Sequence, residues 1–256
     1  LSDFKEQMKM PLCAIAHGQV SANTMLHITL ALNATQIKQF ELYYQELIEW
    51  NKKFNLTTIT DYQEAQIKHF VDSLTITSAL TKEELKKANF NIIDIGTGAG
   101  FPGVPLKILL THPKLVLVES TAKKTVFLRH IIHKLELNNV EVVNSRAEEI
   151  AHLPLYREQF ALVVSRALAS LPTLVELALP FCQIGGKFVA QKKGKISEEI
   201  IKANKAIATL GGKLGQVKKI ELEGLRDERY LVIIDKIYLT PDKYPRRPGI
   251  AKRRPI

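Results

Sequence analysis

The chain has 256 residues, of which 46% are hydrophobic, so it can bury one sizeable core with a smaller helical appendage more readily than two full domains. The 36 Lys and Arg residues against 26 Asp and Glu give a net charge of +10, which favours a polyanionic partner, nucleic acid first. Cys13 and Cys182 provide neither a disulfide framework nor a C-x-x-C metal site, and no apolar run approaches the roughly 20 residues that cross a bilayer. We therefore expect a cytoplasmic protein that binds no metal and does not span a membrane.

The first third of the chain is predicted to be helical after an irregular beginning. Residues 1–32 show no sustained hydrophobic period and are expected to form a loosely ordered lead-in. Asn33 and Gln36 resemble a capping pair, and apolar residues then recur at helical spacing. A helical N-terminal region is assigned to 33–88, with helices over 33–50, over about 61–80 and in a short segment that starts near 81.

From residue 91 the pattern changes to short runs rich in Ile, Val and Leu, separated by amphipathic segments of helical length. This alternation is typical of βαβ units and predicts an α/β domain over 89–240 with a mostly parallel sheet. The last two runs are separated only by 223–229, which is too short for a helical crossover, so these two strands are expected to pair antiparallel at one end of the sheet. The seven predicted strands are 91–95, 115–119, 140–144, 161–165, 186–191, about 216–222 and 230–238.

The segment 241–256 combines four prolines with six basic residues. Proline lacks a backbone donor and has a fixed φ, so we expect this segment to join neither a helix nor a central strand. It is predicted to be an extended basic tail.

The first predicted strand ends in alternating glycines, Gly96, Gly98 and Gly100, behind the acidic Asp94. Because glycine has no Cβ, the backbone there can take positive φ and approach a ligand closely. The pattern suits a dinucleotide, S-adenosylmethionine or only a tight strand-to-helix turn. Phe101-Pro102 stands where a pyrophosphate-binding helix would begin, which disfavours NAD, and the chain has no G-x-x-x-x-G-K-[ST] loop.

Polar residues at the ends of later strands are candidate ligand contacts, because open α/β sheets bind ligands outside their carboxyl ends. Glu119 ends the second strand and could accept both hydroxyls of an adenosine ribose. Residues 144–149 could meet an adenine edge, although Ala-Glu-Glu is also an ordinary helix start. Arg166 ends the fourth strand, and its partner could be a cofactor carboxylate, a substrate phosphate or a neighbouring side chain.

Two further groups are assigned structural roles. His69 and Asp72 lie three apart on one predicted helix and could be mistaken for an acid/base pair, but we expect a hydrogen bond from the helix to the α/β domain. Cys182 follows Phe181 rather than proline and is expected to be a buried structural thiol.

Several ordered segments, spread from about residue 40 to 250, match a known family. They are 49–57 (EWNKKFNLT), 69–74 (HFVDSL), the glycine motif through Gly103, 145–149 (SRAEE), 165–167 (SRA) and 244–249 (YPRRPG). On these segments the chain resembles the small-subunit ribosomal RNA methyltransferase G family, also called glucose-inhibited division protein B. The resemblance implies a Rossmann-like class I methyltransferase fold with a seven-stranded, mostly parallel sheet.

The resemblance also implies an activity and a set of site residues. The activity is methyl transfer from S-adenosylmethionine to N7 of one guanine in 16S rRNA, guanine 527 in the usual rRNA numbering. Guanine N7 carries a free lone pair, so direct in-line attack needs no general base and no catalytic residue is assigned. The implied cofactor contacts are Gly96, Gly98, Phe101, Ala147, Glu148 and Arg166, with Glu119 and Ser120 on the ribose side.

Positive charge is concentrated in two parts of the chain. Residues 183–205 hold six lysines against Glu198 and Glu199, and 239–256 hold six basic residues against Asp242. We expect both segments to bind phosphates of 16S rRNA or the small ribosomal subunit, although a solvated lysine face would also explain 183–205. The protein is expected to act as a monomer. The predicted RNA contacts are Lys192, Lys193, Arg246 and Arg247.

Two other functions stay open on the sequence. A nicotinamide-dependent oxidoreductase would need a hydride-facing residue, which we cannot identify. A non-catalytic RNA-binding or assembly factor would bind RNA without incorporating a methyl group.

Overall fold

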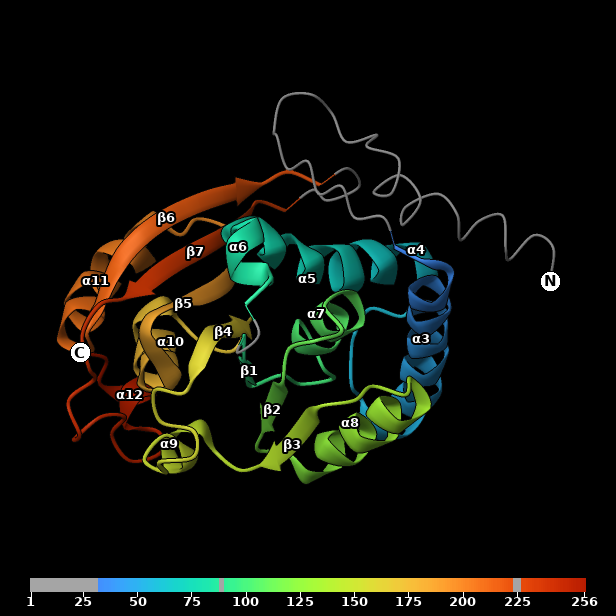
Figure 1. Cartoon of the computed structure of the whole chain (residues 1–256), viewed down its shortest axis with the longest axis horizontal. Helices are drawn as coiled ribbons and strands as arrows, with labels where there is room; N and C mark the ends of the chain where they lie inside the picture. The colour runs from blue at the N-terminus through green and yellow to red at the C-terminus, as the bar shows by residue number, and fades with distance from the viewer. Residues whose placement is uncertain (1–31, 88–89, 223–226) are drawn as a thin grey trace.

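The computed structural model describes residues 32–87, 90–222 and 227–256, and its centre is a seven-stranded sheet with helices on both faces (Figure 1). Residues 1–31 of the lead-in predicted over 1–32, Cys13 among them, lie outside the described residues. The strand order is β3-β2-β1-β4-β5-β7-β6. The strands are β1 (Ile92–Ile95), β2 (Leu115–Glu119), β3 (Val140–Asn144), β4 (Phe160–Arg166), β5 (Cys182–Lys193), β6 (Gly212–Ile220) and β7 (Arg229–Lys236).

The sheet confirms the predicted topology. β1 pairs parallel with β2 and β4, β2 with β3, and β4 with β5. β7 is the reversed strand, because it runs antiparallel to both β5 and β6. β6 begins at Gly212, before the predicted start, since backbone pairing with the end of β7 extends it through a segment without an apolar pattern.

Side chains alternate between the two faces of the sheet and bury a separate core on each side. On one face, Ile92, Leu117 and Val164 pack against helices of the N-terminal region and against α7 and α8. On the other face, Ile93 and Val163 pack against α9, α10 and α11. The helices are α3 (Ala34–Phe54), α4 (Tyr62–Ala65), η1 (Gln66–Val71), α5 (Asp72–Leu74), η2 (Thr75–Ala79), α6 (Lys82–Leu85), α7 (Gly103–Leu109), α8 (Ala122–Lys134), α9 (Ala147–Ile150), α10 (Leu171–Ala178), η3 (Leu179–Phe181), α11 (Ser197–Thr209) and α12 (Ile250–Arg253).

The predicted cap of α3 is present. The Asn33 side chain accepts from the Gln36 backbone N–H, and the Gln36 side chain accepts from the Asn33 backbone N–H, both at 2.9 Å. These bonds satisfy two donors that the helix itself leaves free at its start. The buried side of α3 carries Phe40, Tyr43 and Leu47, so the helix packs its apolar stripe against the core.

The segment predicted as one helix over 61–80 changes its hydrogen-bond pattern along its length, from α4 through the π-helix η1 and α5 to the 3₁₀ helix η2. Hydroxyl side chains explain part of this change. Ser73, Thr75 and Thr77 donate to the carbonyls of His69, Asp72 and Leu74, and such bonds compete with the regular helix ladder. No helix among the described residues is long and apolar enough to cross a membrane.

The prediction that 241–256 forms no helix is wrong, because 250–253 form the short helix α12. The left-handed conformation of Gly249, with φ of +82°, turns the chain into this helix after the prolines. Ala251 is 2% exposed, so the segment packs against the α/β domain instead of extending away from it. The predicted burial of Cys182 is confirmed, and burial raises the pKa of its thiol to about 12.

Candidate functional site

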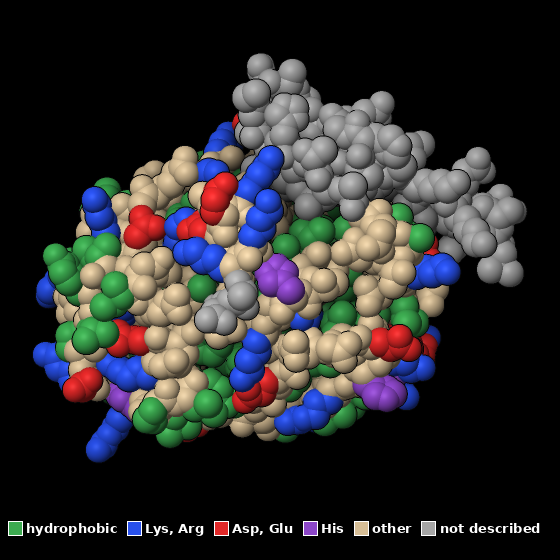
Figure 2. All heavy atoms as spheres, viewed as in Figure 1, with side chains coloured by type: hydrophobic (Ala, Val, Ile, Leu, Met, Phe, Trp, Pro, Cys, Tyr) green, Lys and Arg blue, Asp and Glu red, His purple; other side chains and the backbone are tan. Residues whose placement is uncertain are grey.

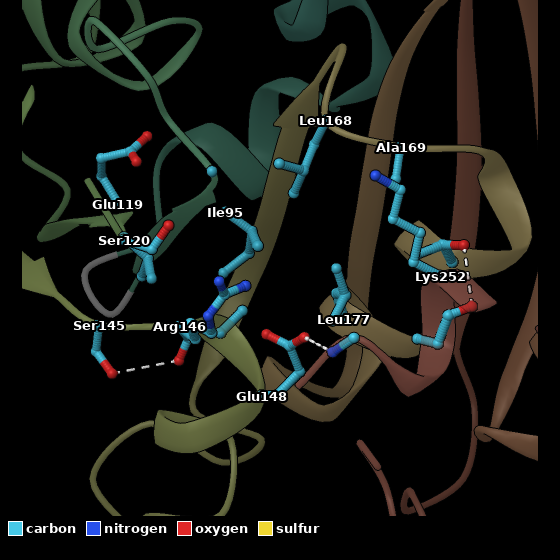
Figure 3. A pocket seen from close by; sticks show the side chains of 16 residues that line it. Ile95, Glu119, Ser120, Ser145, Arg146, Glu148, Leu168, Ala169, Leu177 and Lys252 are labelled. Atoms are coloured by element: carbon cyan, nitrogen blue, oxygen red, sulfur yellow. Dashed lines mark hydrogen bonds between the residues drawn. The ribbon is translucent and has the colours of Figure 1, made fainter. Parts of the chain in front are cut away.

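A pocket lies at the carboxyl ends of β1 to β4, beside α9 and α10 (Figure 3). Open α/β sheets bind their ligands at this edge. The cavity volume is about 260 Å³. We call it the strand-end pocket. It is lined by Ile95, Gly96, Val118, Glu119, Ser120, Ser145, Arg146, Ala147, Glu148, Leu168, Ala169, Thr173, Leu177, Gly249, Ala251 and Lys252.

The glycine turn after β1 forms part of the floor of this pocket. Gly96, Gly98 and Gly100 all have positive φ, which a residue with a Cβ adopts only with strain. A Cβ on Gly100 would lie 2.5 Å from the Tyr43 hydroxyl, whereas a Cβ on Gly98 would meet no described atom within 4 Å. The backbone at Gly98 is therefore open to a ligand, and Gly100 is glycine because the helical region packs directly on it.

Asp94 holds the turn in this shape. Its Oδ2 accepts from the Thr97 hydroxyl at 2.6 Å and from the Gly103 backbone N–H at 2.8 Å. Burial raises the pKa of Asp94 to about 6, against the opposing effect of these two hydrogen bonds. Its Oδ1 is buried and has no hydrogen-bond partner in the described part of the chain. Asp94 thus supports the turn from below and does not line the pocket.

Glu119 connects the end of β2 to the glycine turn. Its Oε2 accepts from the Gly98 backbone N–H at 3.0 Å, and its Oε1 accepts from the Thr121 N–H at 2.8 Å. The residue is 6% exposed, and Figure 3 shows it beside Ser120 on one side of the pocket. Two backbone donors therefore fix this carboxylate at the rim, where a hydroxyl-bearing ligand can reach it.

The end of β3 supplies the adjoining wall. The Asn144 amide donates to the Glu119 carbonyl at 3.0 Å, so the ends of β2 and β3 are held together. Ala147 and Glu148 follow at the start of α9, and the Glu148 carboxylate accepts from the Gly249 backbone N–H at 3.2 Å. The structure thus brings five predicted cofactor residues to the pocket lining, namely Gly96, Glu119, Ser120, Ala147 and Glu148, with Gly98 bonded to Glu119.

Phe101 and Arg166 do not line the strand-end pocket. They belong to what we call the aromatic-arginine cluster, formed by Tyr43, His69, Asp72, Phe101 and Arg166. The Phe101 ring stacks with His69 at 4.5 Å and with Tyr43 at 5.2 Å between ring centroids, and the Arg166 guanidinium lies 4.9 Å from the Phe101 centroid. These contacts join the helical region to the ends of β1 and β4.

Arg166 has a protein partner, which was one of the three alternatives left open by the sequence. Its Nη1 lies 3.3 Å from Asp72 Oδ2 and also donates to the Lys68 carbonyl at 3.1 Å. Arg229 of β7 lies 3.6 Å from the same Asp72 oxygen. The predicted hydrogen bond between the helical segment and the α/β domain is therefore confirmed.

Burial controls the protonation of this cluster. Burial, helped by the nearby Arg166 charge, lowers the pKa of His69 to about 3. It raises the pKa of Asp72, while Arg166 and Arg229 oppose that rise. We assign Asp72 as the anion between two arginines and His69 as a neutral ring, which hydrogen-bonds the Thr57 hydroxyl at 2.8 Å.

The four predicted RNA contacts differ in their surroundings. Lys192 lies 2.8 Å from a Glu199 oxygen and is only 10% exposed, and Arg246 binds the buried carboxylate of Glu176. These intramolecular partners argue against a direct RNA contact by either side chain. Lys193 and Arg247 are exposed and have no side-chain partner among the described residues. On the face in Figure 2, Lys and Arg side chains are interspersed with Asp and Glu and form no single continuous patch.

Sequence reasoning missed half of the pocket wall. Leu168 and Ala169 follow the predicted strand β4, and their position after a strand end could have suggested them. Thr173 and Leu177 lie on one side of α10, which is buried along its whole length and gives no distinct signal. Gly249, Ala251 and Lys252 come from the segment predicted to be a free tail.

The lining suits a nucleoside. Ile95, Leu168 and Leu177 provide apolar surface for a ring, while Glu119 provides acceptors for hydroxyl groups. The strand order with the reversed β7 defines a Rossmann-like methyltransferase fold. The M. jannaschii TYW2 structure in complex with AdoMet shares the fold, with a TM-score of 0.52, 16% identity, and coverage of 70% of this chain and 80% of that one.

The family follows from the sequence comparisons. The family model described as rRNA small subunit methyltransferase G (GidB) matches residues 36–231. Ribosomal RNA small subunit methyltransferase G of Dehalococcoides mccartyi strain BAV1 is 49% identical over 227 residues, covering 89% of this chain and 94% of that protein. The protein of the same name from Clostridium novyi is 46% identical and covers 90% and 93%. The chain belongs to the rRNA small subunit methyltransferase G family.

Proposed function

We propose that this chain transfers a methyl group from S-adenosylmethionine to N7 of one guanine in 16S rRNA, guanine 527 in the usual numbering. The observation that carries the proposal is the Glu119 carboxylate, fixed at the rim of the strand-end pocket by the backbone of the glycine turn. When bound there, S-adenosylmethionine supplies a methyl group on a positively charged sulfur. Family membership supports the rRNA as the substrate.

The side chains of the pocket have distinct tasks in this proposal. Glu119 accepts the ribose hydroxyls, and Ser120 lies beside it. Ala147 and Glu148 face the adenine edge, where a carboxylate can accept from an exocyclic amino group. The apolar side chains of Ile95, Leu168 and Leu177 exclude water from the nucleoside.

No side chain of the pocket is required to move a proton. Guanine N7 presents a lone pair at neutral pH, so the rate enhancement comes from holding nucleophile and methyl donor in line. His69 is neutral, buried and stacked on Phe101, which suits a packing role rather than a general base. Phe101 and Arg166 would act on the cofactor only through the position of the glycine turn.

For the RNA side, we propose that Lys193, at the end of β5, and Arg247, in the segment after β7, contact phosphates, because both are exposed cations without a side-chain partner among the described residues. Lys192 and Arg246 would instead maintain the fold through Glu199 and Glu176. We further propose that one copy of the chain suffices for activity.

The test is methylation of small ribosomal subunits that lack the modification, with labelled S-adenosylmethionine and mapping of the product nucleotide. We expect one labelled guanine, modified at N7. Glu119→Gln should raise the KM for the cofactor at least about tenfold, because it removes a charged acceptor and places an amide NH2 group against one of the two backbone donors. Glu198→Gln, a change of the same kind on exposed α11, is the control. A product on another base or atom would refute the substrate proposal.

A further inference from the structure

The segment from Tyr244 to Lys252 closes one side of the strand-end pocket, and we call it the C-terminal clamp. It follows β7 and lies beyond residue 231, where the match to the family model ends. Its residues Gly249, Ala251 and Lys252 line the pocket, and Figure 3 shows Lys252 on the side opposite Glu119 and Ser120. A segment predicted to be a free basic tail is therefore part of the wall around a proposed ligand.

A buried carboxylate anchors the clamp. Glu176 belongs to the apolar helix α10, and its side chain is 1% exposed. Its Oε1 accepts from the Arg246 backbone N–H at 2.9 Å and from Nε at 2.8 Å, and its Oε2 accepts from Nη2 at 2.6 Å. A planar guanidinium matches a carboxylate with two parallel bonds, which a lysine cannot reproduce. Arg246 thus fixes both the position and the orientation of the clamp.

Backbone contacts hold the clamp on either side of this anchor. Arg157 donates to the Tyr244 carbonyl at 2.9 Å, and His152 hydrogen-bonds the Pro245 carbonyl at 2.9 Å. At the other end, the Thr173 hydroxyl donates to the Ala251 carbonyl at 3.2 Å. These partners come from the loop after α9 and from α10, and α10 also lines the pocket.

The clamp also contacts a residue proposed to recognise the adenine. The Gly249 backbone N–H donates to the Glu148 carboxylate, and Gly249 can do so because its φ of +82° turns the backbone toward α9. Lys252 is exposed and has no ion pair in the described ranges. Figure 3 shows its side chain extending toward Leu168 and Ala169 at the pocket mouth. Its methylene chain covers the pocket there while the amine stays in water.

We infer that the C-terminal clamp is a cofactor-binding element, which forms the adenine-side wall of the pocket and orients Glu148. Arg246 is then a positioning residue for the cofactor and not a phosphate contact. This inference rests on the proposed function, because it assigns the clamp to the S-adenosylmethionine site. It predicts that substitutions in the clamp weaken cofactor binding more than they weaken binding to the ribosomal subunit.

The test measures the Kd of S-adenosylmethionine by calorimetry and the KM values for cofactor and small subunits, on the full chain. We expect Arg246→Ala to raise the cofactor Kd about tenfold or more, and Arg246→Lys to give an intermediate value, because it keeps the charge but loses the paired bonds. Lys252→Ala, at an exposed position where folding is not at risk, should raise the Kd about threefold. Lys213→Ala removes the same charge from an exposed position of β6 that does not line the pocket, and it should leave the Kd unchanged.

The outcomes separate the clamp from the proposed function. Wild-type protein that neither binds S-adenosylmethionine nor methylates subunits overturns both. If the wild type binds and methylates, but Lys252→Ala and a folded Arg246 variant keep the wild-type cofactor Kd, only the clamp assignment fails. If the variants raise the KM for subunits and leave the cofactor Kd unchanged, the clamp assignment is wrong and these residues contact RNA. A raised cofactor Kd with an unchanged KM for subunits supports the clamp.

Discussion

The strand-end pocket and the aromatic-arginine cluster lie on either side of the same glycine turn, yet one is hollow and the other is filled. In the pocket, Glu119 is fixed by two backbone donors and faces a cavity. In the cluster, Arg166 is surrounded by Asp72, two backbone carbonyls and the Phe101 ring. Both contain residues that the family resemblance assigned to the cofactor.

The residues that the family resemblance assigns to the cofactor therefore fall into two groups, those that border the pocket and those that join the helical region to the α/β domain. Residues that border a ligand leave polar atoms and open space on one side. Residues that join the helical region to the α/β domain use their polar atoms on protein partners and leave no space. The match to a motif alone therefore does not identify a contact, whereas the partners of each side chain do.

The largest expected effect comes from the cluster. Arg166→Ala leaves the buried Asp72 with only Arg229, which is 3.6 Å away, and opens a gap beside Phe101. Breaking a buried ion pair costs about 3–5 kcal/mol, and we expect a loss of about 3 kcal/mol in the free energy of unfolding, measured in urea. Arg247→Ala, at an exposed position, is the control. If Arg166→Ala kept the wild-type free energy of unfolding but lost cofactor binding, Arg166 would be a cofactor contact instead.

His69 tests whether the cluster depends on a neutral ring. Its folded pKa of about 3 lies below the ordinary 6.5, so the unfolded chain binds a proton that the folded chain does not. The stability that this provides is complete above pH 6.5 and is lost as pH falls toward 3, by up to about 1.4 kcal/mol per pH unit. His69→Gln should flatten the loss between pH 6.5 and 4 in urea unfolding. An unchanged slope would mean that His69 is protonated in the folded protein.

Asp94, beneath the glycine turn, should respond to pH in the opposite direction. Its folded pKa of about 6 lies above the ordinary 3.8, so the folded chain binds the extra proton and this contribution to stability grows as pH falls from 6 to 4. The window is narrower than that of His69, so the total effect is smaller. Asp94→Asn can keep both bonds at Oδ2 and should abolish the pH-dependent difference. If the stability of wild type and variant depended on pH in the same way, the pKa of Asp94 would not be raised by folding.

Lys193 lies in neither region and should show the smallest effect. Lys193→Ala is expected to reduce the slope of log affinity for small subunits against log salt by about one, without a change in cofactor Kd. The neighbouring Lys192→Ala is the matched comparison, because Lys192 is paired with Glu199 and should affect folding more than the salt slope. A filter-binding series across salt concentrations distinguishes them. Equal salt slopes for wild type and Lys193→Ala would remove Lys193 from the RNA contacts.

Much of the fold could be predicted because local composition determines it. The buried strands β1, β2 and β4 are mostly apolar runs, and the ends of β2 and β4 place Glu119 and Arg166 at one edge of the sheet. The short link before β7 excluded a helical crossover and hence a parallel pairing. These features depend on residues close together in the chain, which a sequence displays directly.

The partners of the charged residues could not be predicted, because they come from distant parts of the chain. Arg166 meets Asp72, and Arg246 meets Glu176, across 94 and 70 positions. One signal was available for the second pair, since Glu176 is the one charged residue in a mostly apolar helix and, once buried, needs a cation. For the first pair, the sequence supplied the three alternatives but no means to choose among them.

The position of β7 also sets an order for biosynthesis. β7 is made after β6 but lies between β5 and β6, so the free edge of β5 and the facing edge of β6 stay unpaired until residues 229–236 are available. The clamp follows β7 in the chain and can seat only once this strand is in place. A nascent chain that ends before β7 therefore leaves two strand edges unpaired and the pocket without one wall. If the clamp binds the cofactor as inferred, full cofactor affinity appears only when synthesis of these last elements is complete.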